Sequence, residues 1–280
     1  MVKVGVHVSI AGSIAASVER AMDAGCDTFQ IFSRSPRGWK FRDLAPEEVD
    51  AFRGNMGASG IGPAVDHMPY LPNLASPKEE IYGQSVATLT TELRRCDQLG
   101  IPFLVTHLGH HMGAGMEGGY AQVIGAVNRA LSEAPGAVML LLETTAGEKN
   151  SVGGTFEDIR RILDGIEKRK RVGVCFDTCH AFAAGYDLRA PEALGETMDH
   201  LKDVIGFPLL KVVHLNDARG ELGGRLDRHE HIGMGSIGEE GFRTILHHPV
   251  FRKLPLICET PVDDRRDDRG NIAKVRELAA

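Results

Sequence analysis

The stretch from residue 214 to residue 235, HLNDARGELGGRLDRHEHIGMG, combines histidines and carboxylates in a spacing suited to metal chemistry. It follows the apolar run 209–213, which is typical of a buried parallel strand, so we expect His214 at the carboxyl end of a strand. The loop that follows returns Asp227 and His229 toward the same end. Neutral imidazole and carboxylate are ligands that suit zinc and its neighbours. Taken alone, the stretch also fits a polar loop that happens to be rich in histidine.

Other apolar runs of the chain also have a histidine or a carboxylate at their C-terminal end. A single histidine at a strand end is more often a buried structural residue than a metal ligand, but six such strand ends in a row are not explained by core packing. The candidate metal ligands are five histidines and four carboxylates: His67, His107, Glu143, Asp177, His180, His214, Asp227, His229 and Glu259.

Short apolar runs alternate with amphipathic segments eight times, which predicts βαβ units and a parallel sheet. We expect strands at residues 2–8, 28–32, 61–65, 103–107, 137–143, 172–177, 209–214 and 256–259. We expect helices at residues 13–24, 46–59, 77–99, 121–133, 155–170, 191–205, 238–247 and 271–278. Eight repeats in 280 residues predict an α/β fold, a single (β/α)8 TIM barrel over residues 1–280. In such a barrel the functional residues lie at the C-terminal face of the strands, where the candidate ligands are expected.

Composition is that of an ordinary globular protein, with 42% hydrophobic and 25% charged residues. No run of 18 apolar residues predicts a transmembrane helix, and the N-terminal segment does not resemble a signal peptide, so we expect a cytoplasmic protein with no membrane partner. The five cysteines are odd in number and lie mostly in apolar segments, which favours reduced thiols over disulfides. Cys175 and Cys179 flank Asp177, and we interpret both as buried residues rather than ligands.

Nine ligands are too many for one metal ion, because a catalytic zinc usually takes three protein ligands and a water. They suit two or three metals with a bridging carboxylate. The net charge of −6 argues by itself against a nucleic-acid partner. Three divalent ions would nevertheless contribute +6 against −4 from the four carboxylates, leaving the pocket at about +2 and attractive to phosphate. Metal clusters of this kind are suited to phosphodiester cleavage.

Three motifs carry a resemblance to a known family. GVCFDTCH at residues 173–180, HLND at 214–217 with DRH at 227–229, and ETTAG at 143–147 resemble the endonuclease IV family of apurinic/apyrimidinic (AP) endonucleases. The resemblance extends from the opening GVHVS to Glu259-Thr260, nearly the whole chain. It implies a barrel with three zinc ions that cleaves double-stranded DNA 5′ to abasic sites, leaving a 3′-hydroxyl and a 5′-deoxyribose phosphate. We also expect removal of 3′-blocking groups. A monomer is the default expectation, and general metal chemistry allows manganese or iron in one position.

The resemblance also assigns the ligands and the residues that act on DNA. His67, His107 and Glu143 would hold the first metal, and Glu143 would bridge to a second that is held also by Asp177, His214 and Glu259. His180, Asp227 and His229 would hold the third. Glu143 and Glu259 are the expected catalytic residues, with Glu259 orienting or deprotonating the nucleophile. The sequence itself offers Arg37 with Trp39 and Tyr70 with Leu71 as DNA-binding side chains that wedge into the duplex, and Arg37, Tyr70 and Leu71 also resemble the DNA-penetrating positions of the family. Ordinary packing is the alternative for Trp39 and Tyr70. The nearby basic cluster consists of Arg34, Arg37, Lys40 and Arg42.

The chain departs from the family pattern at three positions. Pro69 removes an N–H that could contact DNA, and Thr144 replaces a common asparagine beside Glu143. His231 is an additional histidine, which we interpret as inert and solvated rather than as support for the third metal. Two alternative functions stay open: a metal-dependent sugar isomerase or epimerase, and a lesion-binding protein without catalysis.

Overall fold

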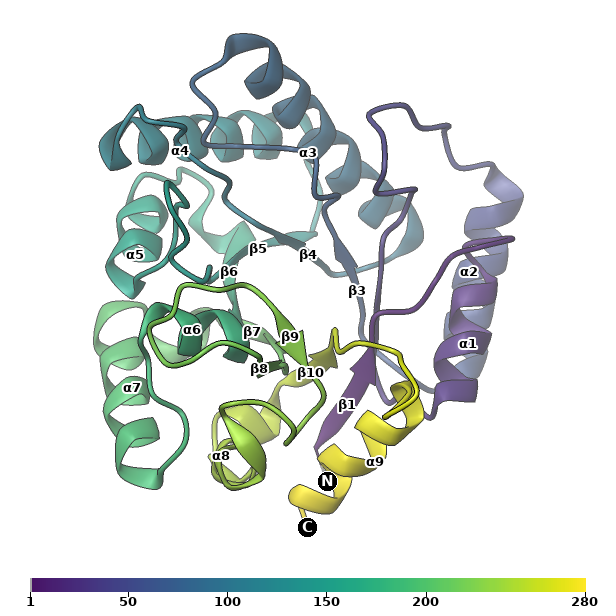
Figure 1. The fold of residues 1–280 in the computed structure, drawn as a ribbon. Coiled ribbons are helices and arrows are strands. Elements are labelled where there is room, and N and C mark those ends of the chain that lie inside the picture. The colour runs from purple at the N-terminus through teal and green to yellow at the C-terminus, as the bar shows by residue number, and fades with distance from the viewer. Residues whose placement is uncertain (1) are drawn as a thin grey trace.

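Eight parallel strands form the barrel of this computed structural model, which describes residues 2–280, and helices surround the strands (Figure 1). The strands pair in the order β1-β10-β7-β6-β5-β4-β3-β2. A parallel bridge between His7 and Gln30, with a 2.8 Å hydrogen bond from the Val8 N–H to the Gln30 carbonyl, joins the two ends of this order. The predicted TIM barrel is therefore confirmed. Its strands are β1 Lys3–Val6, β2 Phe29–Ile31, β3 Ala64–His67, β4 Phe103–Thr106, β5 Met139–Glu143, β6 Val172–Asp177, β7 Leu210–His214 and β10 Pro255–Cys258.

Helices cover the outside of the barrel and alternate with the strands along the chain. They are α1 Ala16–Ala24, α2 Pro46–Ser59, α3 Glu79–Leu99, α4 Met116–Glu133, α5 Phe156–Asp164, α6 Thr178–Ala184, α7 Pro191–Val204, α8 Gly238–His247 and α9 Asp268–Leu278. Helix α9 packs against β1, which brings the last helix beside the first strand (Figure 1). Within residues 2–280, no helix has the length and apolar character needed to cross a membrane.

Every predicted strand and helix is present, but several predicted ends were wrong. Strand β3 begins only after Pro63, which has no N–H to offer a strand ladder. Helix α5 ends at Asp164, before Gly165. The short helix α6 was not predicted, nor was a two-stranded antiparallel hairpin formed by β8 Asp217–Ala218 and β9 His229–Glu230. Short 3-10 helices at Phe207–Leu209 and Phe251–Lys253 were not predicted either.

The apolar core has two layers, as the alternation of side chains along a strand requires. The outer layer lies between the strands and the helices and holds most of the buried apolar residues. The inner layer fills the barrel and consists of one residue from each of six strands: Val65, Val105, Leu141, Cys175, Val212 and Ile257.

Candidate metal centre

Six candidate ligands are positioned by strand register. Side chains two residues apart point to the same face of a strand, so a residue two places after an inner-layer residue also points into the barrel. The pairs are Val65 and His67, Val105 and His107, Leu141 and Glu143, Cys175 and Asp177, Val212 and His214, and Ile257 and Glu259. The candidate ligands therefore form the layer directly above the inner apolar core, at the carboxyl ends of the strands.

The other three candidate ligands depend on helix α6 and on the β8–β9 hairpin, which the sequence did not predict. Asp177 caps helix α6 by accepting a 2.8 Å hydrogen bond from the His180 N–H, which fixes His180 one turn beyond the strand. The β8–β9 hairpin returns Asp227 and His229 over the strand ends. The buried Asp217 carboxylate anchors the segment after this hairpin by accepting hydrogen bonds from the N–H groups of Gly235 (2.9 Å) and Ile237 (3.0 Å).

All nine candidate ligands meet in three groups, and within each group the candidate ligand atoms lie within 4.8 Å of one another. The groups are His67, His107 and Glu143; then Glu143, Asp177, His214 and Glu259; then His180, Asp227 and His229. Glu143 belongs to two groups because its Oε2 faces the Nε2 atoms of His67 (3.2 Å) and His107 (3.1 Å), while its Oε1 lies 2.8 Å from Nδ1 of His214. This grouping matches the partition that the family resemblance implies.

Four of the five histidines use one ring nitrogen as a hydrogen-bond donor to a neighbouring oxygen, so that the other ring nitrogen faces the centre. The Nδ1 atoms of His67, His180 and His229 donate to the carbonyl oxygens of Met68 (2.7 Å), Thr144 (2.8 Å) and Glu259 (3.1 Å), and Nε2 of His214 donates to Oε1 of Gln30 (2.8 Å). Metal-binding histidines in proteins are oriented in this way.

Two buried nitrogens give a direct test of whether these residues fit a metal. The Nε2 atoms of His180 and His229 are buried and have no hydrogen-bond partner. Both face Asp227, whose Oδ1 lies 3.1 Å and 3.5 Å from them in directions unsuited to a hydrogen bond. A buried polar atom without a partner costs about 1–3 kcal/mol. A cation between the two imidazoles and the carboxylate would remove that cost, so the donor set fits a divalent metal.

Neighbouring side chains also orient the carboxylates. Asn216 donates from Nδ2 to Asp177 Oδ2 (2.8 Å) and accepts at Oδ1 from the Glu259 N–H (2.7 Å). The Thr144 hydroxyl, at the position of the departure from the family pattern, accepts a 3.0 Å hydrogen bond from the Asp177 N–H. Thr144 therefore contacts the backbone of a candidate ligand through its hydroxyl.

Gln30 is a residue of the site that the sequence analysis missed. It is completely buried, and its Nε2 donates to Oε1 of Glu259 (2.6 Å) while its Oε1 accepts from His214. Gln30 therefore joins two candidate ligands of one group. The available signal was a lone amide in the apolar run 28–32, since a polar side chain inside a predicted buried strand needs partners.

The electrostatics of the centre favour ionised carboxylates. Burial alone raises the pKa of Glu143, but the rings of His107 and His214 outweigh burial and hold that pKa well below its usual value. Burial likewise opposes ionisation of Glu259, and His214 and His67 lower its pKa to about 2. These side chains are therefore anionic at neutral pH, the state in which carboxylates bind metals.

The cysteines near the centre are buried, as predicted. Cys175 lies in the inner apolar layer, and burial raises the pKa of its thiol to about 12. Cys179 lies close enough to Asp177 and His229 to form a further group, but burial raises the pKa of its thiol strongly. Because the thiolate is the metal-binding form, both residues keep their interpretation as non-ligands.

The residues predicted to contact DNA lie in loops that follow the strands at the face of the candidate ligands. Arg37 is exposed and Trp39 is half-buried in the loop after β2, while Tyr70 (65% exposed) and Leu71 (43%) follow β3. The Tyr70 ring contacts the Phe32 ring edge-on, with centroids 5.3 Å apart. Among residues 2–280, most of the exposed large apolar side chains lie in loops after the strands, namely Phe41, Tyr70, Leu71, Met112, Leu222, Leu226, Met234 and Val262.

The prediction of a basic cluster was wrong for Arg34, and the charge of Arg42 is already paired. Arg34 is buried, with its Nε 2.8 Å from Oε1 of Glu92, so it is not available to DNA. Arg42 is exposed, but its guanidinium makes two 2.5 Å hydrogen bonds to Glu48. Of the cluster, Arg37 and Lys40 are the exposed cations that no ion pair occupies within the described residues.

The interpretation of His231 as solvated was also wrong. The side chain is completely buried, its Nε2 donates to Asp263 (3.0 Å), and its Nδ1 accepts from Nδ2 of Asn271 (3.0 Å). These contacts connect the hairpin to the start of α9 and do not involve the candidate ligands of the third group.

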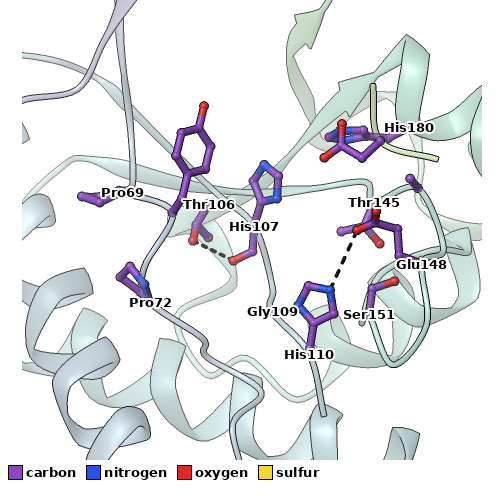
Figure 2. A pocket seen from close by; sticks show the side chains of 13 residues that line it. Pro69, Pro72, Thr106, His107, Gly109, His110, Thr145, Glu148, Ser151 and His180 are labelled. Atoms are coloured by element: carbon purple, nitrogen blue, oxygen red, sulfur yellow. Dashed lines mark hydrogen bonds and ion pairs between the residues drawn. The ribbon is translucent and has the colours of Figure 1, made fainter. Parts of the chain in front are cut away.

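A small pocket of about 90 Å³ opens to solvent beside His107, His180 and Asp227. Figure 2 shows its walls, with Pro69 and Pro72 on one side and Glu148 and Ser151 on the other. Its lining is partly apolar and partly polar, and candidate ligands of two groups border it. The pocket is therefore a small recess that opens the edge of the cluster to solvent.

Comparisons with known proteins agree with this geometry. Residues 18–279 match the family model described as xylose isomerase-like TIM barrel. A protein of Methanoculleus marisnigri named "Probable endonuclease 4" is 67% identical over 280 residues, covering 100% of this chain and 99% of that protein. The crystal structure of endonuclease IV from Thermus thermophilus superposes with a TM-score of 0.88 at 38% identity, covering 99% of this chain and 98% of that one. A D-tagatose 3-epimerase-like protein, with a TM-score of 0.71 at 18% identity, shares the fold alone over 99% of this chain and 98% of its own. The chain belongs to the endonuclease IV family of AP endonucleases.

Proposed function

We propose that this protein is a DNA-repair endonuclease that hydrolyses the phosphodiester bond 5′ to abasic sites in double-stranded DNA, using three zinc ions. The observation that carries the proposal is the arrangement of nine side chains into three groups, with ring nitrogens oriented toward the centre and two of them left without partners. The name endonuclease 4, borne by relatives that match the whole chain, supports the same activity.

Side chains of one group would hold each metal, with Glu143 shared between two. The first site would use His67 and His107 with Glu143, the second Asp177, His214 and Glu259 with Glu143, and the third His180, Asp227 and His229. Bound divalent metals would supply the Lewis acidity that makes water nucleophilic at neutral pH and that offsets charge on the phosphate. Zinc suits this mixed imidazole and carboxylate set, and manganese or iron is the alternative in one position.

The chain's own residues would position the reacting groups. Glu259 is held by Gln30 at Oε1 and by Asn216 at its backbone N–H, so its Oε2 keeps a fixed direction into the centre. Its pKa near 2 leaves it ionised, as a base that orients a water or takes its proton must be. Glu143 would hold the first and second sites at a fixed separation.

The loops above the centre would recognise the lesion. An abasic sugar-phosphate must leave the helix to reach a recessed centre, and side chains that enter the vacated stack favour that state. Tyr70 and Leu71, with Arg37 and Trp39 from the neighbouring loop, are exposed or partly exposed there. The pocket bordered by His107 and His180 would take the displaced group. The products would be a 3′-hydroxyl and a 5′-deoxyribose phosphate, and the same centre would remove 3′-blocking groups. We expect a cytoplasmic monomer.

The first test is incision of a duplex carrying one defined abasic site, with protein before and after metal stripping by a strong chelator. We expect cleavage 5′ to the lesion without added magnesium, loss of cleavage on stripping, and recovery with zinc. Absence of incision by protein with a measured full metal content would reject the proposal. A ketose epimerisation assay on the same sample would then test the alternative of a sugar isomerase or epimerase. The D-tagatose 3-epimerase-like protein shares the fold of this chain.

A further inference from the structure

The loop of residues 32–45, between β2 and α2, contains Arg37 and Trp39 and has no helix or strand of its own. Irregular loops of this length inside a compact fold are uncommon and are usually functional. An irregular loop that must present side chains in fixed positions needs contacts from outside itself. In this protein those contacts come from buried charged residues on helix α3.

Helix α3 turns a polar stripe toward the protein interior. Thr88, Glu92 and Arg95 recur at helical spacing, which places them on one face, and all three are buried. Glu92 Oε1 lies 2.8 Å from the Nε of the buried Arg34, which comes from the loop. Burial raises the pKa of Glu92, while a hydrogen bond from Ser33 and the charges of Arg34 and Arg95 oppose that effect.

These side chains hold the loop at its start, middle and end. At the start, Ser33 donates from Oγ to Glu92 Oε2 (2.5 Å) and its carbonyl accepts from Arg95 Nη2 (2.5 Å). In the middle, Arg34 Nη1 donates to the carbonyl of Trp39 (3.2 Å). At the end, Arg95 Nη1 donates to the carbonyl of Arg42 (3.1 Å). The exposed Arg37 lies between these attachment points.

The same attachment connects the loop to the candidate metal centre. The Ser33 N–H donates to Oδ1 of the buried Asp66 (2.8 Å), and Asp66 directly precedes His67 in strand β3. The start of the loop therefore has a fixed position relative to one candidate ligand.

Stability alone does not account for the buried charged side chains of Arg34, Glu92 and Arg95. Buried ion pairs lose solvation energy when they form, and apolar side chains of similar volume often stabilise a protein as well or better. A guanidinium can, however, donate in several fixed directions at once, which an apolar side chain cannot do. The contacts to Ser33 and Arg42 use that property.

We propose that Glu92 and Arg95, with Arg34, are positioning residues for substrate binding, because they hold the 32–45 loop so that Arg37 and Trp39 keep their places on the face that carries the candidate metal centre. This inference rests on the proposed function for the role of the loop, but the attachment itself is measured separately.

Trp39 makes the test direct, because it is the single tryptophan in the chain. Two variants loosen the attachment: Glu92→Gln removes the charge with little change in shape, and Arg95→Lys keeps the charge but loses the guanidinium that reaches both Ser33 and Arg42. The matched control is Glu133→Gln, which breaks an exposed ion pair with Arg129 on α4. Each protein is measured for Trp39 anisotropy and acrylamide quenching, thermal stability, metal content, and KM and kcat on abasic duplex.

We expect both variants to retain their metals and a kcat within about twofold of the wild-type value. Trp39 should become more mobile and more easily quenched, and KM should rise on the order of tenfold to a hundredfold. Glu133→Gln should match the wild type in every readout. Arg95→Lys leaves the pairing charge in place, so it tests the proposal even if Glu92→Gln does not fold.

Unchanged Trp39 quenching and KM in a folded variant would overturn the proposal, as would a fall in stability with no change at Trp39. Greater Trp39 mobility with an unchanged KM would also overturn it, while wild-type incision would leave the proposed function intact. Failure of the wild-type protein to cut abasic DNA would reject the proposed function, and the Trp39 measurements would still decide whether Glu92 and Arg95 hold the loop.

Discussion

The candidate metal centre and the 32–45 loop are neighbouring parts of one face, but they are positioned in different ways. Six candidate ligands lie at or directly after the ends of strands that are each paired with two neighbouring strands. The loop has no such ladder and depends on the side chains of Glu92, Arg95 and Arg34. Chemistry and recognition can therefore fail separately: changes at the centre should reduce turnover, whereas changes at the loops should reduce substrate binding.

The largest effect that would test this separation is expected at Glu259. Glu259→Gln removes the base while nearly keeping the shape, so turnover should fall about 10²- to 10⁴-fold. Thermal stability should change little, because the side chain lies at the open end of the barrel. Single-turnover incision, with metal content measured on the same sample, checks this. Full activity in the variant would remove Glu259 from its assigned role.

A smaller effect is expected at Gln30, which supports the centre without contacting substrate. Gln30→Leu leaves His214 and Glu259 without their shared partner, so metal affinity should fall about 10- to 100-fold. Competition with a chromophoric chelator measures that affinity, and Gln98→Leu on the exposed side of α3 is the control. Wild-type affinity in Gln30→Leu would show that strand register alone positions these two ligands.

The smallest effect is expected at Tyr70, on the recognition side of the comparison. Tyr70→Ala removes a ring that is 65% exposed, so the free energy of unfolding should change little. Loss of a stacking side chain should weaken binding to abasic duplex by about 1 kcal/mol or more, roughly fivefold in Kd. Fluorescence titration with abasic and undamaged duplexes checks this. Equal affinity for abasic duplex in both proteins would reject Tyr70 as a wedge, and a large fall in kcat would break the separation between the two regions.

The barrel and the set of candidate ligands could be predicted from the order of residues along the chain. Apolar runs alternating with amphipathic segments predict (β/α) repeats, and the polar residues that follow those runs must gather at one face when the strands are parallel. The motifs around Asp177 and His214 then indicated the family. These features were accessible because they depend on local periodicity and on sequence order.

The burial and the hydrogen-bond partners of each polar residue, by contrast, depend on contacts between residues that are distant in the sequence. Arg34 belongs to the same basic stretch as Arg37, yet Arg34 is buried against Glu92, which is 58 positions away in the sequence, and Arg37 is exposed. Gln30 joins His214 and Glu259, and His231 is buried between Asp263 and Asn271. Each of these environments is created by a partner distant in sequence. Because a polar side chain is stable inside a protein only when such partners satisfy it, its role is decided by packing rather than by its neighbours along the chain.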